Sequence, residues 1–161
     1  YGVDTISLRY AAVISAWSGP GTSVPARVLS SLAGPAARGE VSVIDDPYLV
    51  WQGGEEFIDA RDCAHANVAA LDAEDPAQGI YHIGLGRLHG FEDFVAGVRR
   101  CHPALRVDMR VAPQGGFAGF AHVRRASSDI SAAARELAWQ PTHALADSID
   151  HFGPFCIANE N

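Results

Sequence analysis

The stretch FIDARDCAHANVAALDA, residues 57–73, combines the patterns of a short strand, a turn and an amphipathic helix. Phe57 and Ile58 begin an apolar run that favours a buried strand. We expect Asp62 to cap the helix, because its carboxylate can accept the free amide hydrogens of the first turn. Helical spacing then predicts one buried face, formed by Ala64, Val68 and Leu71.

The rest of the chain alternates predicted strands and helices, which favours an α/β fold. The expected strands are residues 3–15, buried on both faces, and residues 40–45, 80–83 and 105–111. The first expected helix has Ser23 as its cap, Pro25 in its first turn and a break at Gly34–Pro35. The later helices are expected from Phe91 to Cys101, from Ser128 or Asp129 to Trp139, and from Thr142 onward.

Core positions follow from the same periodicity. In the three longer helices the residues expected to face inward are Val28, Leu29 and Leu32, then Phe91, Phe94, Val95 and Val98, and finally Leu145, Ile149 and Phe152. Trp139 is also expected to serve packing. A chain of 161 residues with no long linker predicts a single domain over residues 1–161.

Composition narrows the classes of function. The formal net charge of −7 repels a phosphate backbone, so nucleic acid is not an expected partner. No apolar run is long enough to span a bilayer and no secretory signal pattern is present, so a membrane is not expected either. Cys63, Cys101 and Cys156 form no CxxC pair, which favours a reducing, cytoplasmic compartment.

Two further absences concern the chemistry of the chain. All twelve basic residues are Arg, so this chain supplies neither a Schiff-base lysine, nor a P-loop lysine, nor the lysine of a Tyr/Lys proton-transfer pair. The seven histidines lack companions at metal-ligand spacing, and we therefore expect no metal site.

Several local patterns leave two interpretations open. The turn GLGRLHG at residues 84–90, with Asp108 beyond it, imitates a dinucleotide fingerprint but also fits a packing turn. Asp59 and Asp62 could form an acid/base pair, or end a strand and cap a helix. Loop aromatics could stack on a substrate or cover the core, and the arginines could hold an anion or remain solvated. The aromatics are Trp17, Tyr48 and Trp51, and the arginines are Arg87, Arg124 and Arg125.

Four segments together resemble the C-terminal half of an extended short-chain dehydrogenase/reductase, the NAD-dependent epimerase/dehydratase family. Residues 1–13, YGVDTISLRYAAV, resemble a strand of the type YGLxxxxLRxxNV, and a GPG follows at residues 19–21. Residues 57–71 are similar to RDFIxVxDxAxAxxxAL, and residues 80–86, IYHIGLG, are similar to YNIGSG. Residues 129–141, DISAAARELAWQP, resemble DxSKAxxELGWxP. The matches occur in the family's order and spacing.

The chain departs from the family pattern at the residues that carry function. The family's GxxGxxG loop and catalytic Tyr-x-x-x-Lys would precede Tyr1. Ala12 replaces an Asn that contacts substrate in the family. Glu55 replaces the Arg that grips a substrate pyrophosphate, and Glu56 replaces the following Asp. A carboxylate repels a diphosphate, which disfavours a nucleotide sugar bound in the family's usual way.

The resemblance implies edge strands of a Rossmann-type parallel sheet plus a small substrate-binding lobe, with the N-terminal half of the family fold absent. It implies NAD or NADP as cofactor, bordered here by Tyr10, Ala11, Ala12 and Val13, and not bound by this chain alone. Substrate contacts, with a sugar nucleotide or related sugar, are expected from Trp17, Tyr48, Trp51, Glu55 and Arg87.

Two hypotheses of different class remain. The chain is either the substrate-binding portion of an epimerase, dehydratase or reductase, inactive when isolated, or a non-enzymatic remnant. Both predict an exposed strand edge over residues 5–14, which would bind either the missing Rossmann half or a second copy of the chain.

Overall fold

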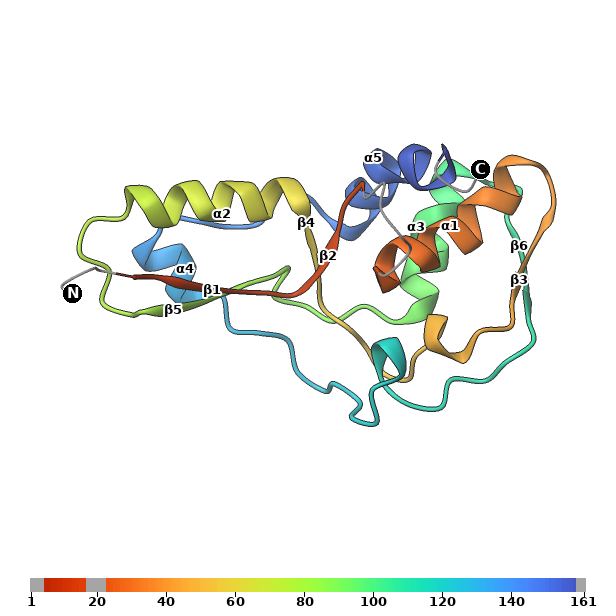
Figure 1. The fold of residues 1–161 in the computed structure, drawn as a ribbon, viewed down its shortest axis with the longest axis horizontal. Coiled ribbons are helices and arrows are strands. Elements are labelled where there is room, and N and C mark those ends of the chain that lie inside the picture. Colours follow the sequence, from red (N-terminus) through yellow and green to blue (C-terminus); the bar gives the residue numbers. More distant parts are fainter. Residues whose placement is uncertain (1–4, 17–22, 159–161) are drawn as a thin grey trace.

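A computed structural model describes residues 5–16 and 23–158 and has an α/β fold (Figure 1). The described strands form parallel pairs: β1 (Ser7–Tyr10) with β5 (Ile80–Ile83), β2 (Ala12–Ile14) with β4 (Phe57–Asp59), and β3 (Val41–Ile44) with β6 (Arg106–Met109). The helices are α1 (Val24–Ala37), α2 (Ala60–Asp72), α3 (Phe91–Cys101), α4 (Ser131–Glu136) and α5 (Leu145–Ala158). Two 3-10 turns complete it, η1 (Pro47–Leu49) and η2 (Phe117–Gly119). The predicted α/β class is confirmed.

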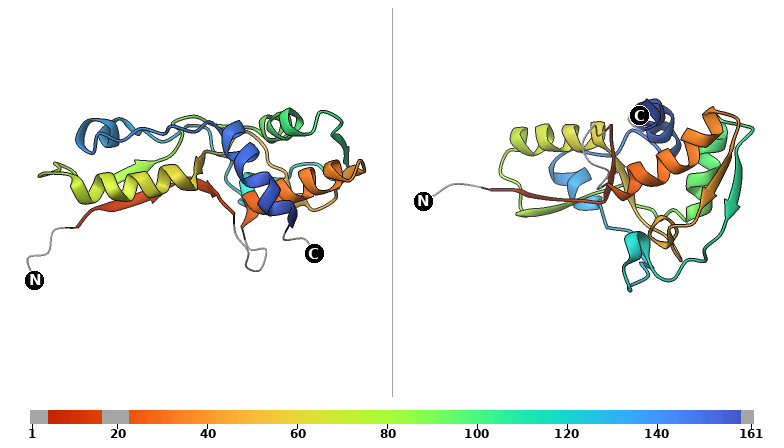
Figure 2. Two further views of the ribbon diagram at one scale, coloured as in Figure 1. Left: turned by 90° about the horizontal axis from the view of Figure 1, so that it is seen from above. Right: turned by 45° about the vertical axis from the view of Figure 1, so that its right-hand side comes forward.

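The elements fall into two groups along the long axis of the molecule. The β1–β5 pair, α2 and α4 lie at one end, while the β3–β6 pair lies at the other end with α1 and α3 (Figures 1 and 2). Each group has its own cluster of buried side chains. Phe57 of β4 belongs to the larger cluster, and its neighbour Ile58 belongs to the smaller one. The β2–β4 pair therefore forms a wall between two cores.

The predicted first strand is divided in two. The chain bends after Tyr10, so that β1 pairs with β5 whereas β2 pairs with β4. Ser7, Arg9 and Tyr10 are exposed, so the prediction that this strand is buried on both faces is wrong. Among the described residues, β5 is the sole strand paired with β1, which leaves the second edge of β1 open.

The orientation of α2 also differs from the prediction. Asp59 is its N-cap and accepts a hydrogen bond from the amide of Arg61, while Asp62 lies in the first turn. Ala66 is buried, but Val68 and Leu71 are 55% and 85% exposed, and Ala64 is exposed too. The predicted buried face is thus wrong, because the helix turns Asp62 and Ala66 inward instead.

The other helices agree in part with the sequence. The α3 boundaries and its four inward residues are confirmed, and so are the buried residues of α1 and α5. Ser23 caps α1 as expected, but the helix continues past Pro35 to Ala37, because a proline in the last turn costs few hydrogen bonds. A left-handed residue, Ala138, follows α4, which ends at Glu136 rather than Trp139, and α5 begins only at Leu145. No helix in the described ranges could span a membrane.

Candidate functional site

The candidate site lies where the carboxyl ends of β1 and β5 meet the amino ends of β2 and β4. Two backbone hydrogen bonds join the strands there. The amide of Ala11 donates to the carbonyl of Ile83 at 2.9 Å, and the amide of Ala12 donates to the carbonyl of Glu56 at 3.0 Å. Ligands of open α/β sheets bind beyond the carboxyl ends of parallel strands, so this junction is the natural place for one.

The side chain of Glu56 is fully buried at the junction and accepts three hydrogen bonds. Its Oε1 atom accepts from the amide of Gly86 at 2.8 Å. Its Oε2 atom accepts from Nη2 of Arg124 and from the amide of Ser128, both at 2.8 Å. A buried carboxylate needs such donors, and the network joins β4 to the turn after β5 and to the segment before α4.

Arg124 is almost completely engaged by protein groups. Its Nη1 atom lies 2.7 Å from Oε1 of Glu55, and Nη2 also donates to the hydroxyl of Ser128. Its Nε atom donates to the carbonyl of Ala126. A guanidinium has five N–H groups, so four of them are used here. Arg124 therefore has little capacity left to hold an anionic ligand, because its one positive charge is already shared by Glu55 and Glu56.

The glycine-rich turn after β5 is a packing feature. Gly86, with a φ of +66°, gives its amide to Glu56, so the group that could bind a phosphate already binds a carboxylate. A methyl group on Gly84 would collide with Oε1 of Glu56. Of the two interpretations of residues 84–90, the packing turn is the one that fits this geometry.

Arg87 and His89 form a second polar contact beside the junction. Nε of Arg87 donates to Nε2 of His89 at 2.9 Å. Burial and then the charge of Arg87 lower the pKa of His89, so its imidazole is neutral and its Nε2 atom accepts. Nδ1 of His89 has no hydrogen-bond partner among the described residues.

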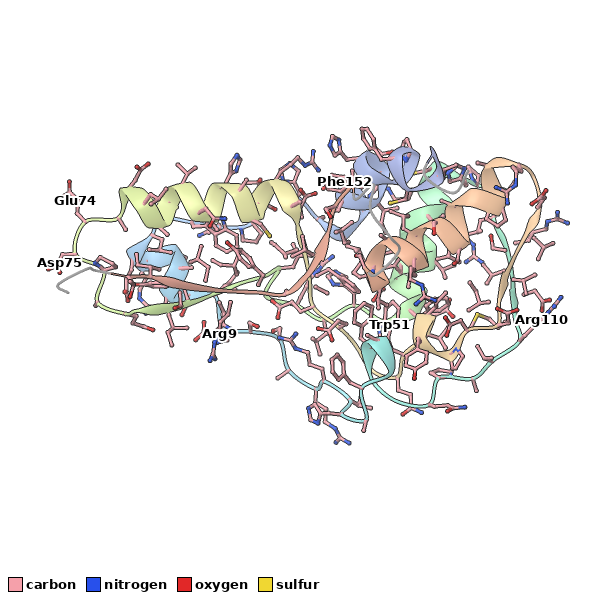
Figure 3. All side chains as sticks on the ribbon, in the orientation of Figure 1. Arg9, Trp51, Glu74, Asp75, Arg110 and Phe152 are labelled. Carbon is pink, nitrogen blue, oxygen red and sulfur yellow. The ribbon has the colours of Figure 1, made fainter. Side chains whose placement is uncertain are left out.

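The three aromatics singled out as substrate contacts are placed differently. Trp51 is 3% exposed and packs edge-on against Phe91 and Phe117, so it belongs to the larger core (Figure 3). Tyr48, by contrast, is 56% exposed in η1. Trp17 lies outside the described residues.

Asp59 and Asp62 are structural groups rather than an exposed acid/base pair. Burial alone would raise the pKa of Asp59, but hydrogen bonds from Arg61 and Ser148 lower it. Burial likewise opposes ionisation of Asp62, and hydrogen bonds from Thr142 and His143 lower its pKa. Both carboxylates are therefore ionised; Asp59 joins the end of β4 to α5 through Ser148, and Asp62 joins α2 to residues 142–143 before α5.

The residues expected to border a cofactor lie at the junction itself. Ala11 and Ala12 are half-buried, and their amides are bonded to Ile83 and Glu56. Tyr10 is 41% exposed at the end of β1, and Val13 is half-buried in β2. The structure thus brings this group together with Glu55 and Glu56, while Tyr48 lies apart in η1.

The family model for the NAD dependent epimerase/dehydratase family matches residues 1–84, just over half of the 161 residues. The chain belongs to this family. No curated protein is similar enough in sequence to count as a relative. The matched region includes β1, β2, β4 and β5, the strands that form the junction.

Solved structures support the fold. GalE-like L-threonine dehydrogenase from Cupriavidus necator is 19% identical, with a TM-score of 0.71 over 99% of this chain and 55% of that one. UDP-glucose 4-epimerase from Thermotoga maritima, solved with UDP-glucose, is 20% identical, with a TM-score of 0.66 over 96% of this chain and 46% of that one. L-threonine dehydrogenase from Phytophthora infestans is 19% identical, with a TM-score of 0.68 over 95% and 48%. This chain spans about half the length of these structures.

Sequence reasoning missed the central ion pair of the site. It left open whether Arg124 holds an anion or remains solvated, whereas the structure pairs Arg124 with Glu55 and Glu56. The adjacent acids were the available signal, but the pairing depends on segments far apart in the sequence.

Proposed function

We propose that this chain is the C-terminal, substrate-binding half of an NAD(P)-dependent epimerase, dehydratase or dehydrogenase of this family. We further propose that it is inactive alone and that it contributes to binding a sugar nucleotide or a related sugar. The family match supports this class of chemistry. The observation that carries the proposal is the open edge of β1.

The open edge offers backbone groups to another strand. On the paired side, the amide of Ser7 donates to Gly79 and that of Ala11 donates to Ile83. Because successive residues of a strand point their amides to opposite sides, those of Leu8 and Tyr10 are directed to the open edge. Unpaired N–H and C=O groups of this kind favour the addition of a further strand.

The outer face of α2 supports the same proposal. A groove of about 760 Å³ runs between β1 and α2, with Leu8 and Tyr10 on one side and Leu71 on the other. It reaches Asp75 at the end of the molecule (Figure 3). The exposed side chains of Val68 and Leu71 form an apolar face on α2 that another layer of structure would cover. A strand beside β1 with a helix packed on α2 would bury both features.

The junction fits a limited contribution to an NAD site. An NAD held beside the junction would supply reversible hydride transfer with the substrate. Ala11 and Ala12 offer small side chains but no free amide, so they can border a nicotinamide without gripping it. The chain also lacks the Lys of a Tyr/Lys pair. Ala11 and Ala12 therefore only border the cofactor site, and the hydrogen-bond donors that hold the cofactor must come from the Rossmann half.

A second candidate function is self-association: the chain would bind a second copy of itself through residues 5–14 and have no enzyme activity. The open edge of β1 and the groove beside α2 favour this function as well. The three free cysteines support a reducing compartment for either function, and we propose the cytoplasm.

NAD titration and native mass spectrometry of the chain test the proposal. We expect no NAD binding by the chain alone at about 1 mM, and tighter NAD binding by a mixture with the Rossmann half of the Cupriavidus necator enzyme than by that half alone. NAD binding by the chain alone at about 1 mM would contradict the proposal. A dimer that dissociates in Leu71→Asp but persists in the control Phe155→Asp would favour the second function, since both residues are exposed.

A further inference from the structure

The contact between Arg87 and His89 can exist only while His89 is uncharged. The side chain of His89 is 4% exposed, and its Nε2 atom accepts from Nε of Arg87 at 2.9 Å. A guanidinium has donors but no acceptor, so Nε2 must offer a lone pair. A proton on Nε2 would place two N–H donors opposite each other. Protonation of the ring therefore breaks this contact.

No carboxylate among the described residues accepts a hydrogen bond from this ring. The charged groups that face it are Arg87 of its own turn, Glu56 of β4 and Asp93 of α3. Both oxygens of Glu56 already accept hydrogen bonds, and Oδ2 of Asp93 accepts from the amide of Gly90 at 2.7 Å. Nδ1 of His89 is buried without a partner. A protonated His89 would thus be a buried cation with no acceptor for either N–H group.

The backbone of His89 keeps the ring in this position. Its amide donates to the carbonyl of Glu55 at 2.8 Å, and its carbonyl accepts from the amide of Glu55 at 2.9 Å. The indole N–H of Trp51 donates to the same carbonyl at 3.2 Å. On β4, the ring of Phe57 lies 6.2 Å from the imidazole between centroids. Because the bridge between Glu55 and His89 fixes the backbone, we expect the ring to reach water only when this bridge opens.

We propose that Arg87, His89 and the backbone bridge between Glu55 and His89 form a pH-sensitive latch, which joins the turn after β5 to the start of β4. At neutral pH the ring is uncharged, accepts from Arg87, and the latch is closed. In acid the ring takes up a proton from water, Arg87 is released into solvent, and the bridge opens so that the imidazolium is hydrated. Breaking two backbone hydrogen bonds costs less free energy than keeping an unpaired charge buried. The latch does not depend on the function proposed above.

Proton linkage sets the direction of the pH dependence. Burial and then the charge of Arg87 lower the pKa of His89 in the closed state, whereas a hydrated histidine has a pKa of about 6.5. The open state therefore binds the proton more tightly. The latch keeps its full stability above about pH 6.5 and loses stability as the pH falls below that value. Between pH 7.5 and 5.5, uptake of one proton should raise the equilibrium constant for opening at least about threefold.

Amide hydrogen exchange of the 161-residue chain, followed by NMR at pH 7.5 and 5.5, tests this proposal once the intrinsic exchange rates are divided out. The protection of the Glu55 and His89 amides should be at least about threefold lower at pH 5.5 than at pH 7.5. At pH 5.5 it should also be at least about tenfold lower than the protection of Val98 in α3, because the latch opens without unfolding of the whole domain.

Variants assign the effect to His89. His89→Gln removes the titrating ring, so the protection of the Glu55 amide should differ less than about threefold between the two pH values. His65→Gln is the matched control: His65 is exposed on α2, outside the latch, and the variant should behave like the wild type. Circular dichroism checks that both are folded.

Arg87→Met gives an independent test that does not require His89→Gln to fold. This variant keeps the ring and removes the cation that opposes its proton. The ring of His89, followed by NMR, should therefore titrate at a higher pH than in the wild type.

Four results would each overturn the proposal. The first is that the protection of Glu55 and His89 in the wild type falls less than about threefold at pH 5.5. The second is that His89→Gln loses as much protection as the wild type. The third is that Glu55 and Val98 are equally protected at pH 5.5, since the whole domain would then be opening. The fourth is that His89 titrates at the same pH in Arg87→Met as in the wild type.

Discussion

The substitution Arg124→Ala removes the side chain that joins the segment before α4 to β4. In the wild type, Nη2 lies 2.8 Å from Oε2 of Glu56 and Nη1 lies 2.7 Å from Oε1 of Glu55. The variant leaves the carboxylate of Glu56 buried without its cation. Only the amides of Gly86 and Ser128 still donate to it.

The expected loss of stability follows from the burial of the Arg124–Glu56 ion pair. Unit charges 4 Å apart attract by about 4 kcal/mol at an effective dielectric constant of about 20, and breaking a buried pair costs about 3–5 kcal/mol. The side chain of Arg124 is 31% exposed and two backbone donors remain, so we expect about 3 kcal/mol. For a domain of this size, that lowers Tm by roughly 6–12 °C.

Urea unfolding followed by circular dichroism measures this loss. Arg125→Ala is the matched control, because Arg125 is exposed and lies outside the network. It should change the free energy of unfolding by less than about 0.5 kcal/mol. Adding Glu56→Gln to Arg124→Ala should restore part of the stability, since the buried charge is then gone. Equal losses in the two single variants would refute the reasoning.

Three other substitutions or measurements test the site and its surroundings. Gly84→Ala should cost about 1–3 kcal/mol in urea unfolding because its methyl group meets Glu56, while Gly79→Ala, where the space is open, should cost much less; equal losses would show that Glu56 can move. The pKa of Asp62 is lower in the folded chain than in the unfolded chain, so its ionised form stabilises the fold at pH values above the unfolded pKa. The free energy of unfolding should therefore fall as the pH drops below about 4, and it should fall less steeply in Asp62→Asn. Burial raises the pKa of Cys63 from 9.0 to about 12, so its alkylation at pH 8, followed by peptide mass spectrometry, should be about a thousandfold slower than that of an ordinary thiol.

Local patterns predicted those elements whose signals agree with one another. The apolar spacing from Phe91 to Val98 sets α3, and the alternation around Ser42 sets β3. Ser23 and Pro25 mark the start of α1 because a cap and an N-terminal proline act within one turn. These features depend on residues within one or two turns of each other, so the sequence alone is enough to predict them.

Tertiary contacts decided the features that were predicted wrongly. Asp59 and Asp62 are both suitable helix caps; Asp59 serves as the cap, and Asp62 instead accepts hydrogen bonds from residues 142–143. With Asp62 turned inward, Val68 and Leu71 face outward, although their spacing fits a buried face. Periodicity shows that a helix has an apolar face but not what that face contacts.

The network around Glu56 could not be derived from spacing, because Arg124 lies far from it in the sequence. The sequence did show an acid, Glu55, where the family resemblance calls for an arginine, and in the structure Glu55 takes part in an internal ion pair with Arg124. Its partner required the structure. Tyr48 was selected by residue type alone, and the structure shows that its side chain is exposed in η1, which sequence periodicity does not reveal.

The wall formed by β2 and β4 has an evolutionary consequence. Phe57 and Ile14 face one core and Ile58 faces the other, so residues on the two sides of the wall do not share packing partners. Substitutions that lack common contacts change stability almost independently. Mutations can therefore accumulate around α1 and α3 with little effect on the packing of α2 and α4, whereas α5 stays coupled to the start of α2, because Ser148 donates to Asp59 and Arg61 lies over the ring of Phe152. The lobe is free to diverge in ligand preference while the sheet edge keeps its shape.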